Sequence, residues 1–151
     1  MPDYNTIISF FDEYISHYRE LLSFENQKFE YIITNKVSEL GNCLSKEQAL
    51  IMKGNSLETK RVSLLEKEGL AGMKFKELVD SAPEQYAVKI KSRFNELSKY
   101  ISEVKRINDE AMGLVRSKLA VIESKLPTGN TYDGKGDRKS TINSSSLTRN
   151  I

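Results

Sequence analysis

Histidine and cysteine are almost absent from the 151-residue chain, which contains one of each, His17 and Cys43. A single cysteine excludes an intrachain disulfide and favours a reducing compartment. Two such residues are too few for a zinc site of the His/Cys type and give no basis for Cys/His catalysis. We read Cys43 as a small buried hydrophobic residue and His17 as a surface residue on the flank of a helix. The sequence therefore predicts no cofactor, no metal site and no enzymatic activity.

Long apolar runs are missing as well. No stretch approaches 18 uncharged apolar residues, so we expect no membrane-spanning helix. The first residues lack the basic region and the apolar core of a secretory signal peptide. From these features we expect a cytoplasmic protein.

An excess of charge of one sign is also lacking, because the net charge is only +2. Lys and Arg balance Asp and Glu over residues 1–126, and both signs are mixed along that segment. A nucleic-acid-binding protein usually concentrates basic residues on one face. We therefore expect protein partners, and neither a nucleic acid nor a small-molecule substrate.

The chain does contain apolar residues that recur three and four positions apart. This spacing places side chains on one face of a helix, and it predicts long helices over residues 3–33, 36–68 and 83–126. Asp3 is suited to cap the first of them. The first row consists of Ile8, Phe11, Ile15, Tyr18, Leu22, Glu25, Phe29 and Ile32, in which only Glu25 is polar.

The second and third segments carry similar rows. In the second, we expect Gly54 to be a weak point or a bend, because glycine has low helix propensity. In the third, we read Asn108 as a buried amide that fixes the register of the helices. The second row is Val37, Leu40, Leu44, Ile51, Val62 and Leu65, with Leu50, Leu57 and Leu64 beside it. The third is Ile90, Phe94, Leu97, Ile101, Val104, Asn108, Ala111 and Val115.

Glycine and proline mark the breaks between these segments. Residues 69–72 end the second helix, residues 73–79 can form short helical turns, and Pro83 suits the first turn of the third helix after a cap at Asp80 or Ser81. The fold class that we predict is all-α. It is an elongated antiparallel bundle or coiled coil of three long helices, with a short extra helix between the second and the third. We expect a single domain over residues 1–126 and a mobile, Ser-rich and Gly-rich tail over residues 127–151.

The third helix is longer than its partners, so we expect its end to project beyond them. An apolar stripe that no other helix covers is a candidate surface for another polypeptide. The candidate partner-binding residues are Leu114, Val115, Leu119, Val121, Ile122 and Leu126.

The tail contains a partial match to a phosphate-binding loop, which we reject. Gly129, Gly134 and Lys135 have the required spacing, but Gly136 stands where a Ser or Thr must bind magnesium. A helix precedes the segment, whereas the motif needs a preceding strand and a following helix. The sequence therefore gives no support for an NTPase.

Three segments resemble a known family. They read Leu-Glu-Thr-Lys-Arg-Val-Ser-Leu-Leu at 57–65, Ile-Asn-Asp-Glu-Ala-Met-Gly-Leu-Val at 107–115 and Thr-Tyr-Asp-Gly-Lys-Gly at 131–136. With the order of the predicted helices, they are similar to the FlgN family of flagellar export chaperones.

The resemblance implies a cytoplasmic chaperone that binds the hook–filament junction proteins FlgK and FlgL and delivers them to FlhA, the gate of type III export. It implies that the cargo is held through the C-terminal part of the chaperone. It further implies that the turn after the third helix docks on the gate through Tyr132, with Asp133, Gly134 and Gly136.

Other interpretations stay open at this point. The heptads fit a structural coiled coil that only self-associates. A related flagellar chaperone of the FliT or FliS type is a nearer alternative, against which the Tyr132 turn and the long third helix weigh. A nucleic-acid or membrane-surface adaptor could use the basic residues of the tail, but four charges give only weak, salt-sensitive attachment. These four are Lys135, Arg138, Lys139 and Arg149.

Overall fold

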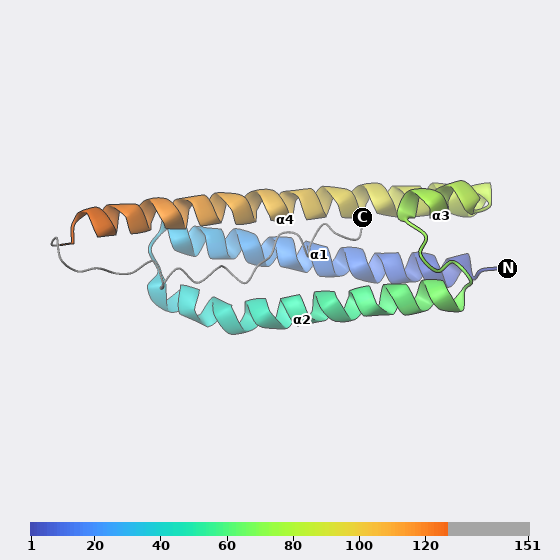
Figure 1. Cartoon of the computed structure of the whole chain (residues 1–151), viewed down its shortest axis with the longest axis horizontal. Coiled ribbons are helices and arrows are strands. Elements are labelled where there is room, and N and C mark those ends of the chain that lie inside the picture. The colour runs from blue at the N-terminus through green and yellow to red at the C-terminus, as the bar shows by residue number, and fades with distance from the viewer. Residues whose placement is uncertain (127–151) are drawn as a thin grey trace.

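The computed structural model describes residues 1–126, and the regular structure in that range is entirely helical (Figure 1). Four helices follow one another along the chain: α1 (Tyr4–Ile33), α2 (Val37–Lys67), α3 (Phe75–Ser81) and α4 (Glu84–Ser124). The predicted all-α class is confirmed. The long helices begin and end within one or two residues of the positions that the apolar spacing predicts.

Short local signals set the ends of α1 and α2. The carboxylate of Asp3 accepts a hydrogen bond from the backbone N–H of Thr6 at 3.2 Å, which caps α1 as the sequence predicts. After α2, Gly69 and Gly72 adopt φ angles of +75° and +76°. Side chains disfavour this left-handed conformation, so glycine is the residue that ends the helix at the least cost.

The interruption between the long helices is itself partly helical, because α3 lies within it. The backbone N–H of Lys74 donates to the carboxylate of Glu77 at 2.9 Å and so secures the first turn of α3. The predicted cap of α4 is wrong. Asp80 and Ser81 belong to α3, and Pro83 is the residue that directly precedes α4.

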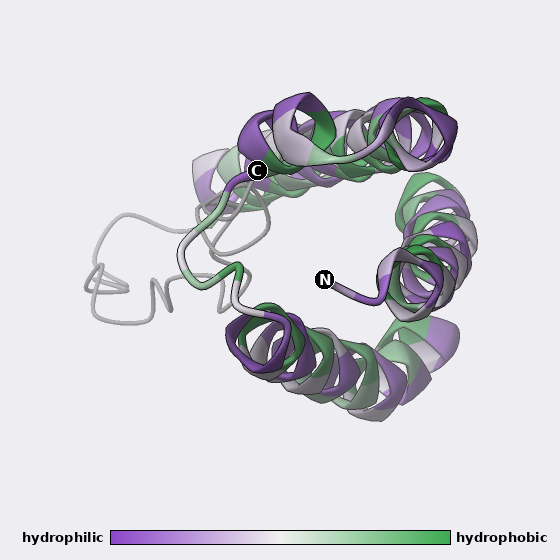
Figure 2. Cartoon of the chain, turned by 90° about the vertical axis from the view of Figure 1, so that its right-hand side faces the viewer, coloured by the Kyte–Doolittle hydropathy of each residue, from purple (hydrophilic) through white to green (hydrophobic). Residues whose placement is uncertain are grey.

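α1 is the central element of the fold. α2 packs on one side of it and runs antiparallel, whereas α4 packs on another side and runs parallel to it (Figure 1). The backbones of α2 and α4 nowhere approach within 8 Å, measured between Cα atoms, and the view along the bundle shows the two helices separated around α1 (Figure 2). The three long helices therefore form an open arrangement, in contrast to a closed three-helix bundle in which every pair would pack.

Ion pairs show which turns of α2 and α4 lie beside which turns of α1. On the α2 side, Lys60 pairs with Glu13 at 2.7 Å. On the α4 side, Arg93 donates to Asp12 at 3.0 Å. Exposed pairs of this kind contribute little stability, about 0–1 kcal/mol each. They serve here mainly to show which turns of the helices lie side by side.

An aromatic cluster closes one end of the molecule, where α3 packs against α4. The ring of Phe75 in α3 lies 4.5 Å from the ring of Phe11 in α1 and 5.2 Å from that of Phe94 in α4, measured between centroids. Tyr4 stacks on Tyr86 at 5.1 Å in the same region. Because buried aromatic rings bring large apolar areas together, this cluster joins α1, α3 and α4 at that end of the fold.

The buried face of α2 differs from the predicted one. Leu50, Leu57 and Leu65 are buried, whereas Val37 and Leu44 are 75% and 65% exposed. The apolar spacing gives α2 two adjacent rows and does not say which of them faces α1. Because α2 lies close to α1 and not to α4, only side chains that face α1 are covered. Of the predicted row, Leu65 is buried, while Val37 and Leu44 face away from α1 and stay exposed.

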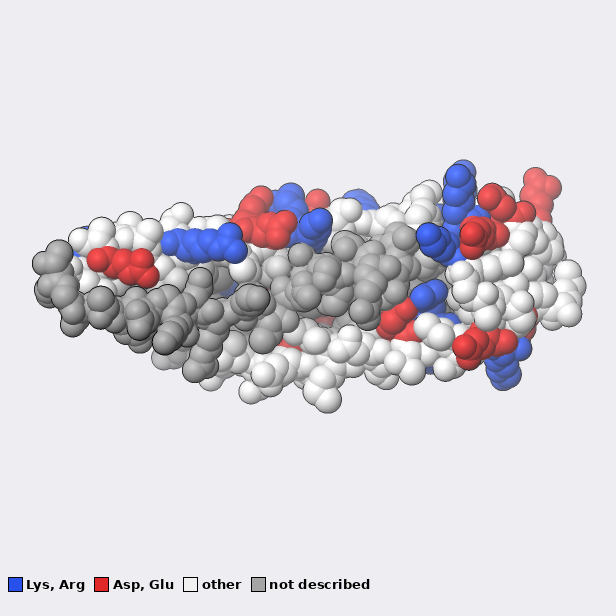
Figure 3. Space-filling view, in the orientation of Figure 1, with Lys and Arg blue, Asp and Glu red and all other residues white. Residues whose placement is uncertain are grey.

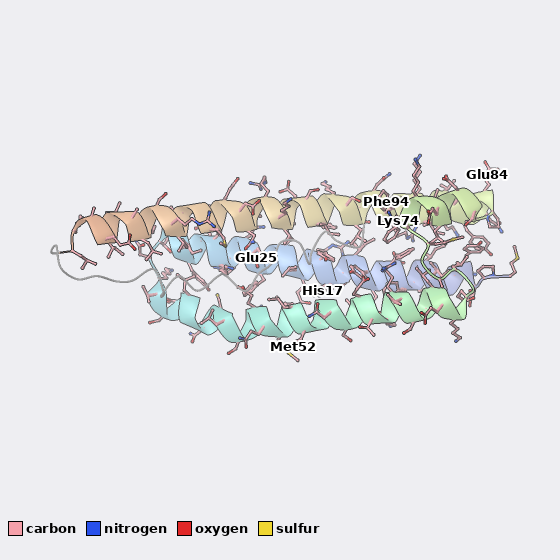
Figure 4. All side chains as sticks on the ribbon, viewed as in Figure 1. His17, Glu25, Met52, Lys74, Glu84 and Phe94 are labelled. Atoms are coloured by element: carbon pink, nitrogen blue, oxygen red, sulfur yellow. The ribbon has the colours of Figure 1, made fainter. Side chains whose placement is uncertain are left out.

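Two further expectations concern the middle of the bundle. His17 is not a surface residue: it is only 2% exposed and lies between α1 and α2 (Figure 4). α2 continues as a helix through Gly54. Cys43 is buried, as predicted. His17 and Gly54 are explained together, because the imidazole lies directly against the glycine.

Candidate protein-binding surface

α4 is longer than the helix on which it packs. Near the end of α1, the ammonium group of Lys118 donates to the backbone oxygen of Ile32 at 2.7 Å and to the side-chain oxygen of Asn35 in the α1–α2 turn. Lys118 therefore ties α4 to the last turn of α1, which ends at Ile33. The turns of α4 beyond Lys118 extend past α1 (Figure 1).

The apolar stripe of α4 continues into this extension. Along α1 its members are enclosed: Val104 is 1% exposed and Ala111 is 3% exposed. The next members become 40% to 56% exposed, namely Val115, Leu119, Ile122 and Leu126. The change occurs where α1 ends, because beyond that point no side chain of α1 covers the stripe. We call these last four residues the α4 stripe.

Two of the six predicted residues lie on a different face of α4. Successive residues of an α-helix are rotated by about 100°, so Leu114 and Val121 share one row while Val115 and Ile122 share the next. Leu114 is half-buried and Val121 is 53% exposed. The structure thus gathers four of the predicted residues into one stripe and separates Leu114 and Val121 from it.

A second exposed apolar row lies on α2, and sequence reasoning predicted it to be buried. It consists of Val37 and Leu44, with the half-buried Ile51 following one heptad later. We call these three residues the α2 row. Its exposure could not be inferred from its spacing, because the same spacing is typical of a covered helix face.

The flank of α2 that carries this row can be assigned from the ion pairs. Lys53 and Lys60 bind Glu20 and Glu13 on one flank of the α1–α2 contact. At about 100° per residue, Leu44 lies on the opposite flank of α2. Glu13 and Glu20 lie on the flank of α1 that is turned away from α4, so the opposite flank of α2 is turned toward α4. The α2 row and the α4 stripe therefore border the same open side of the bundle.

A layer of polar groups crosses the otherwise apolar interior beside these rows. The ammonium group of Lys28 lies 2.9 Å from a carboxylate oxygen of Glu47 and 3.4 Å from Oε2 of Glu25. Glu25 is only 3% exposed, and among the described residues its Oε2 is paired only through this long contact with Lys28. Burial raises the pKa of the Glu25 carboxyl, and the nearby Lys28 acts in the opposite direction.

Asn108 of α4 belongs to the same layer. The contacts of Arg19 with Glu96 and of Lys118 with Ile32 place it beside the turn of α1 that carries Glu25. Asn108 is 3% exposed, and its Oδ1 has no hydrogen-bond partner within the described chain. The interior therefore presents two buried acceptor atoms at one level, from two different helices.

The described residues offer no alternative chemistry at this surface. No group of three or more His, Cys, Asp or Glu side chains in residues 1–126 could hold a metal ion. None of the described helices is both long and apolar enough to cross a membrane. On the face shown in Figure 3, basic and acidic residues lie side by side, without a large area of one sign.

The remaining predicted site residues, Tyr132, Asp133, Gly134 and Gly136, lie outside the described residues. A comparison with protein families matches residues 1–140 to the family described as FlgN protein. The chain belongs to the FlgN family. Membership implies a flagellar export chaperone and places the chain in a family of chaperones that is not known for catalysis. No curated protein and no solved structure is similar enough to be matched.

Proposed function

We propose that this FlgN-family protein binds the junction proteins FlgK and FlgL in the cytoplasm and delivers them to the export gate FlhA. The observation that carries the proposal is the α4 stripe, which continues a packed helix face beyond the end of α1. A helix face that remains apolar where none of the helices in residues 1–126 covers it is suited to a partner helix.

The size of the stripe is compatible with a reversible complex. Burying a Val, Leu or Ile side chain fully contributes roughly 1.5–3 kcal/mol, and the four residues are already about half covered. Binding must also offset the loss of translational freedom and the ordering of side chains. A moderate affinity follows, which fits a chaperone that has to release its cargo.

Docking on the gate is assigned to the turn that contains Tyr132, together with Asp133, Gly134 and Gly136. This part of the proposal rests on the similarity of the turn to the FlgN family. It predicts that Tyr132→Ala weakens binding to the cytoplasmic part of FlhA. The same substitution should leave cargo binding and helix content unchanged, and a loss of helix content would show that Tyr132 has a structural role instead.

The direct test is isothermal titration calorimetry, in which FlgK or FlgL is titrated into the purified full-length protein. The proposal predicts saturable binding to at least one of them. Light scattering of the free protein tests the alternative of a self-associating coiled coil. A stable homo-oligomer that binds neither junction protein would contradict the chaperone proposal and support that alternative.

A further inference from the structure

The open side of the bundle is bordered by two apolar rows from different helices. The α2 row contributes Leu44, which is 65% exposed, and the α4 stripe contributes Val115 and Leu119, which are 40% and 50% exposed. The contact between Lys28 and Glu47 places Leu44 beside the last turns of α1. These turns are level with the start of the α4 stripe, which Lys118 ties to Ile32.

The geometry leaves a place for one more helix between these rows. Packed helices lie about 8–10 Å apart, and α2 and α4 both pack on α1 while their own Cα atoms stay more than 8 Å apart. Seen along the bundle, the three long helices occupy three corners of a four-helix arrangement (Figure 2). A helix at the fourth corner would contact the α2 row and the α4 stripe together.

The polar layer formed by Glu25, Lys28, Glu47 and Asn108 restricts the side chains that such a helix can carry at that level. Asn108 Oδ1 is a buried acceptor without a hydrogen-bond partner in the described chain, and Glu25 Oε2 has only the 3.4 Å ion pair with Lys28. Leaving a buried acceptor unpaired costs about 1–3 kcal/mol. A bound helix with a Lys, Arg or amide side chain at this level could donate hydrogen bonds to the Glu25 carboxylate and to Asn108 Oδ1. The rest of the helix face that packs on the bundle would be apolar.

The chain's own residues 127–151 do not have this pattern. Their only Leu, Ile or Val residues are Ile142, Leu147 and Ile151, which are five and four positions apart. The rest of the segment is rich in Gly, Ser, Thr and Asn, which disfavour a helix interior. A heptad-patterned helix at the fourth corner therefore has to come from another polypeptide.

We infer that the fourth corner binds an amphipathic helix of the exported subunit, so that the α2 row is part of the cargo-binding surface. This inference rests on the proposed chaperone function and extends the surface from α4 to α2. The bound helix carries apolar residues in heptad spacing and one basic or amide residue level with Glu25 and Asn108. Cargo binding thereby completes a four-helix bundle.

The test compares Leu44→Lys with a control of similar exposure on the face of α2 that points away from α1. Met52 is 71% exposed, close to the 65% of Leu44, and it points away from α1 (Figure 4). Each variant is titrated with purified full-length FlgK and FlgL. Leu44→Lys should weaken binding by about fivefold or more, whereas Met52→Lys should bind like the unmodified protein. Urea unfolding of both variants checks that the fold is retained.

A photo-crosslinking amino acid at the same two positions provides a second measurement. From position 44 it should form a crosslink to a heptad-patterned segment of the cargo, and from position 52 it should form none. Crosslinks from position 52 alone, or Leu44→Lys binding like the control, would overturn the inference. If Leu44→Lys instead turns a dimer into a monomer and leaves the cargo titration unchanged, the face joins two copies of this chain, which also overturns it.

The variant Ile122→Lys separates this inference from the function on which it rests. If Ile122→Lys weakens cargo binding and Leu44→Lys does not, the chaperone proposal holds and the fourth-corner inference is wrong. If the unmodified protein binds neither junction protein, the proposed function itself fails.

Discussion

Gly54 of α2 lies directly against the imidazole ring of His17 in α1. A Cβ atom at position 54 would come within 3.1 Å of His17 Nε2, closer than ordinary van der Waals contact. His17 is 2% exposed and is surrounded by packed side chains, so the ring has little room to move. The glycine thus permits a close approach of two helices, and the helix propensity that it costs is offset by the packing that it allows.

The first prediction concerns glycines inside the helices. Gly41 and Gly113 would accept a Cβ atom without any contact within 4 Å, so alanine there should raise the free energy of unfolding by about 0.5–1 kcal/mol through helix propensity. Gly54→Ala should gain less than these two or should destabilise the protein, because His17 has to shift. Urea unfolding at neutral pH measures all three, and an equal gain at position 54 would contradict the described contact.

The second prediction concerns pH. Burial lowers the pKa of His17, and the nearby Lys53 lowers it further, while Glu20 acts in the opposite direction. The unfolded chain, with a histidine pKa near 6.5, therefore takes up the proton first as the pH falls. The contribution of neutral His17 to stability should be fully present above pH 6.5 and should be lost as the pH falls through the lower folded-state pKa.

The measurement for this prediction is the free energy of unfolding from pH 7.5 to pH 5. The control is His17→Gln, which cannot take up the proton. The unmodified protein should lose stability relative to this variant as the pH falls. Parallel curves for the two proteins would show that His17 is not buried as described. Comparing the two proteins removes the contribution of Glu25, which has a raised pKa and changes stability in the opposite sense.

The third prediction concerns the polar layer. Because burial raises the pKa of Glu25, its charged form costs stability as the pH rises above the value for an unfolded glutamate. Glu25→Gln should therefore raise the free energy of unfolding at pH 7. Glu47→Gln is the matched contrast, because it weakens the 2.9 Å interaction with Lys28 and should lower stability by about 1 kcal/mol. A loss of stability in both variants would contradict this account.

The fourth prediction concerns the attachment of α4 to the end of α1. Lys118→Ala removes the hydrogen bonds to Ile32 and Asn35. Backbone amides after position 112 should then exchange with deuterium faster, while exchange in the aromatic end should stay unchanged, because local opening need not involve the whole fold. Lys105→Ala, at an exposed position of the same helix, serves as the control. Equal exchange in the two variants would show that Lys118 does not hold α4.

Much of this fold follows from the sequence, because the information is local. The apolar spacing gives the three long helices, Asp3 gives the start of α1, and Gly69 with Gly72 gives the end of α2. These features depend on residues close together in the chain. The projecting end of α4 could also be inferred, since it requires only that the predicted helix is longer than its neighbours.

The pairing of the faces could not be predicted in the same way. Periodicity identifies two apolar rows on α2 but does not choose between Leu44 and Leu50 as the residue that meets α1. The burial of His17 depends on Gly54, which lies in another helix and which looks like a weak point when read by itself. Each of these features is a relationship between helices.

The central claim is that the α4 stripe binds the cargo, and neighbouring residues of α4 allow a direct test. Ile122 lies on the stripe and is 56% exposed, while Val121 lies outside it and is 53% exposed. The decisive measurement is the dissociation constant of FlgK and FlgL for Ile122→Lys and Val121→Lys. The account predicts at least about fivefold weaker binding for Ile122→Lys and a clearly smaller effect for Val121→Lys. Equal constants for the two variants would contradict it.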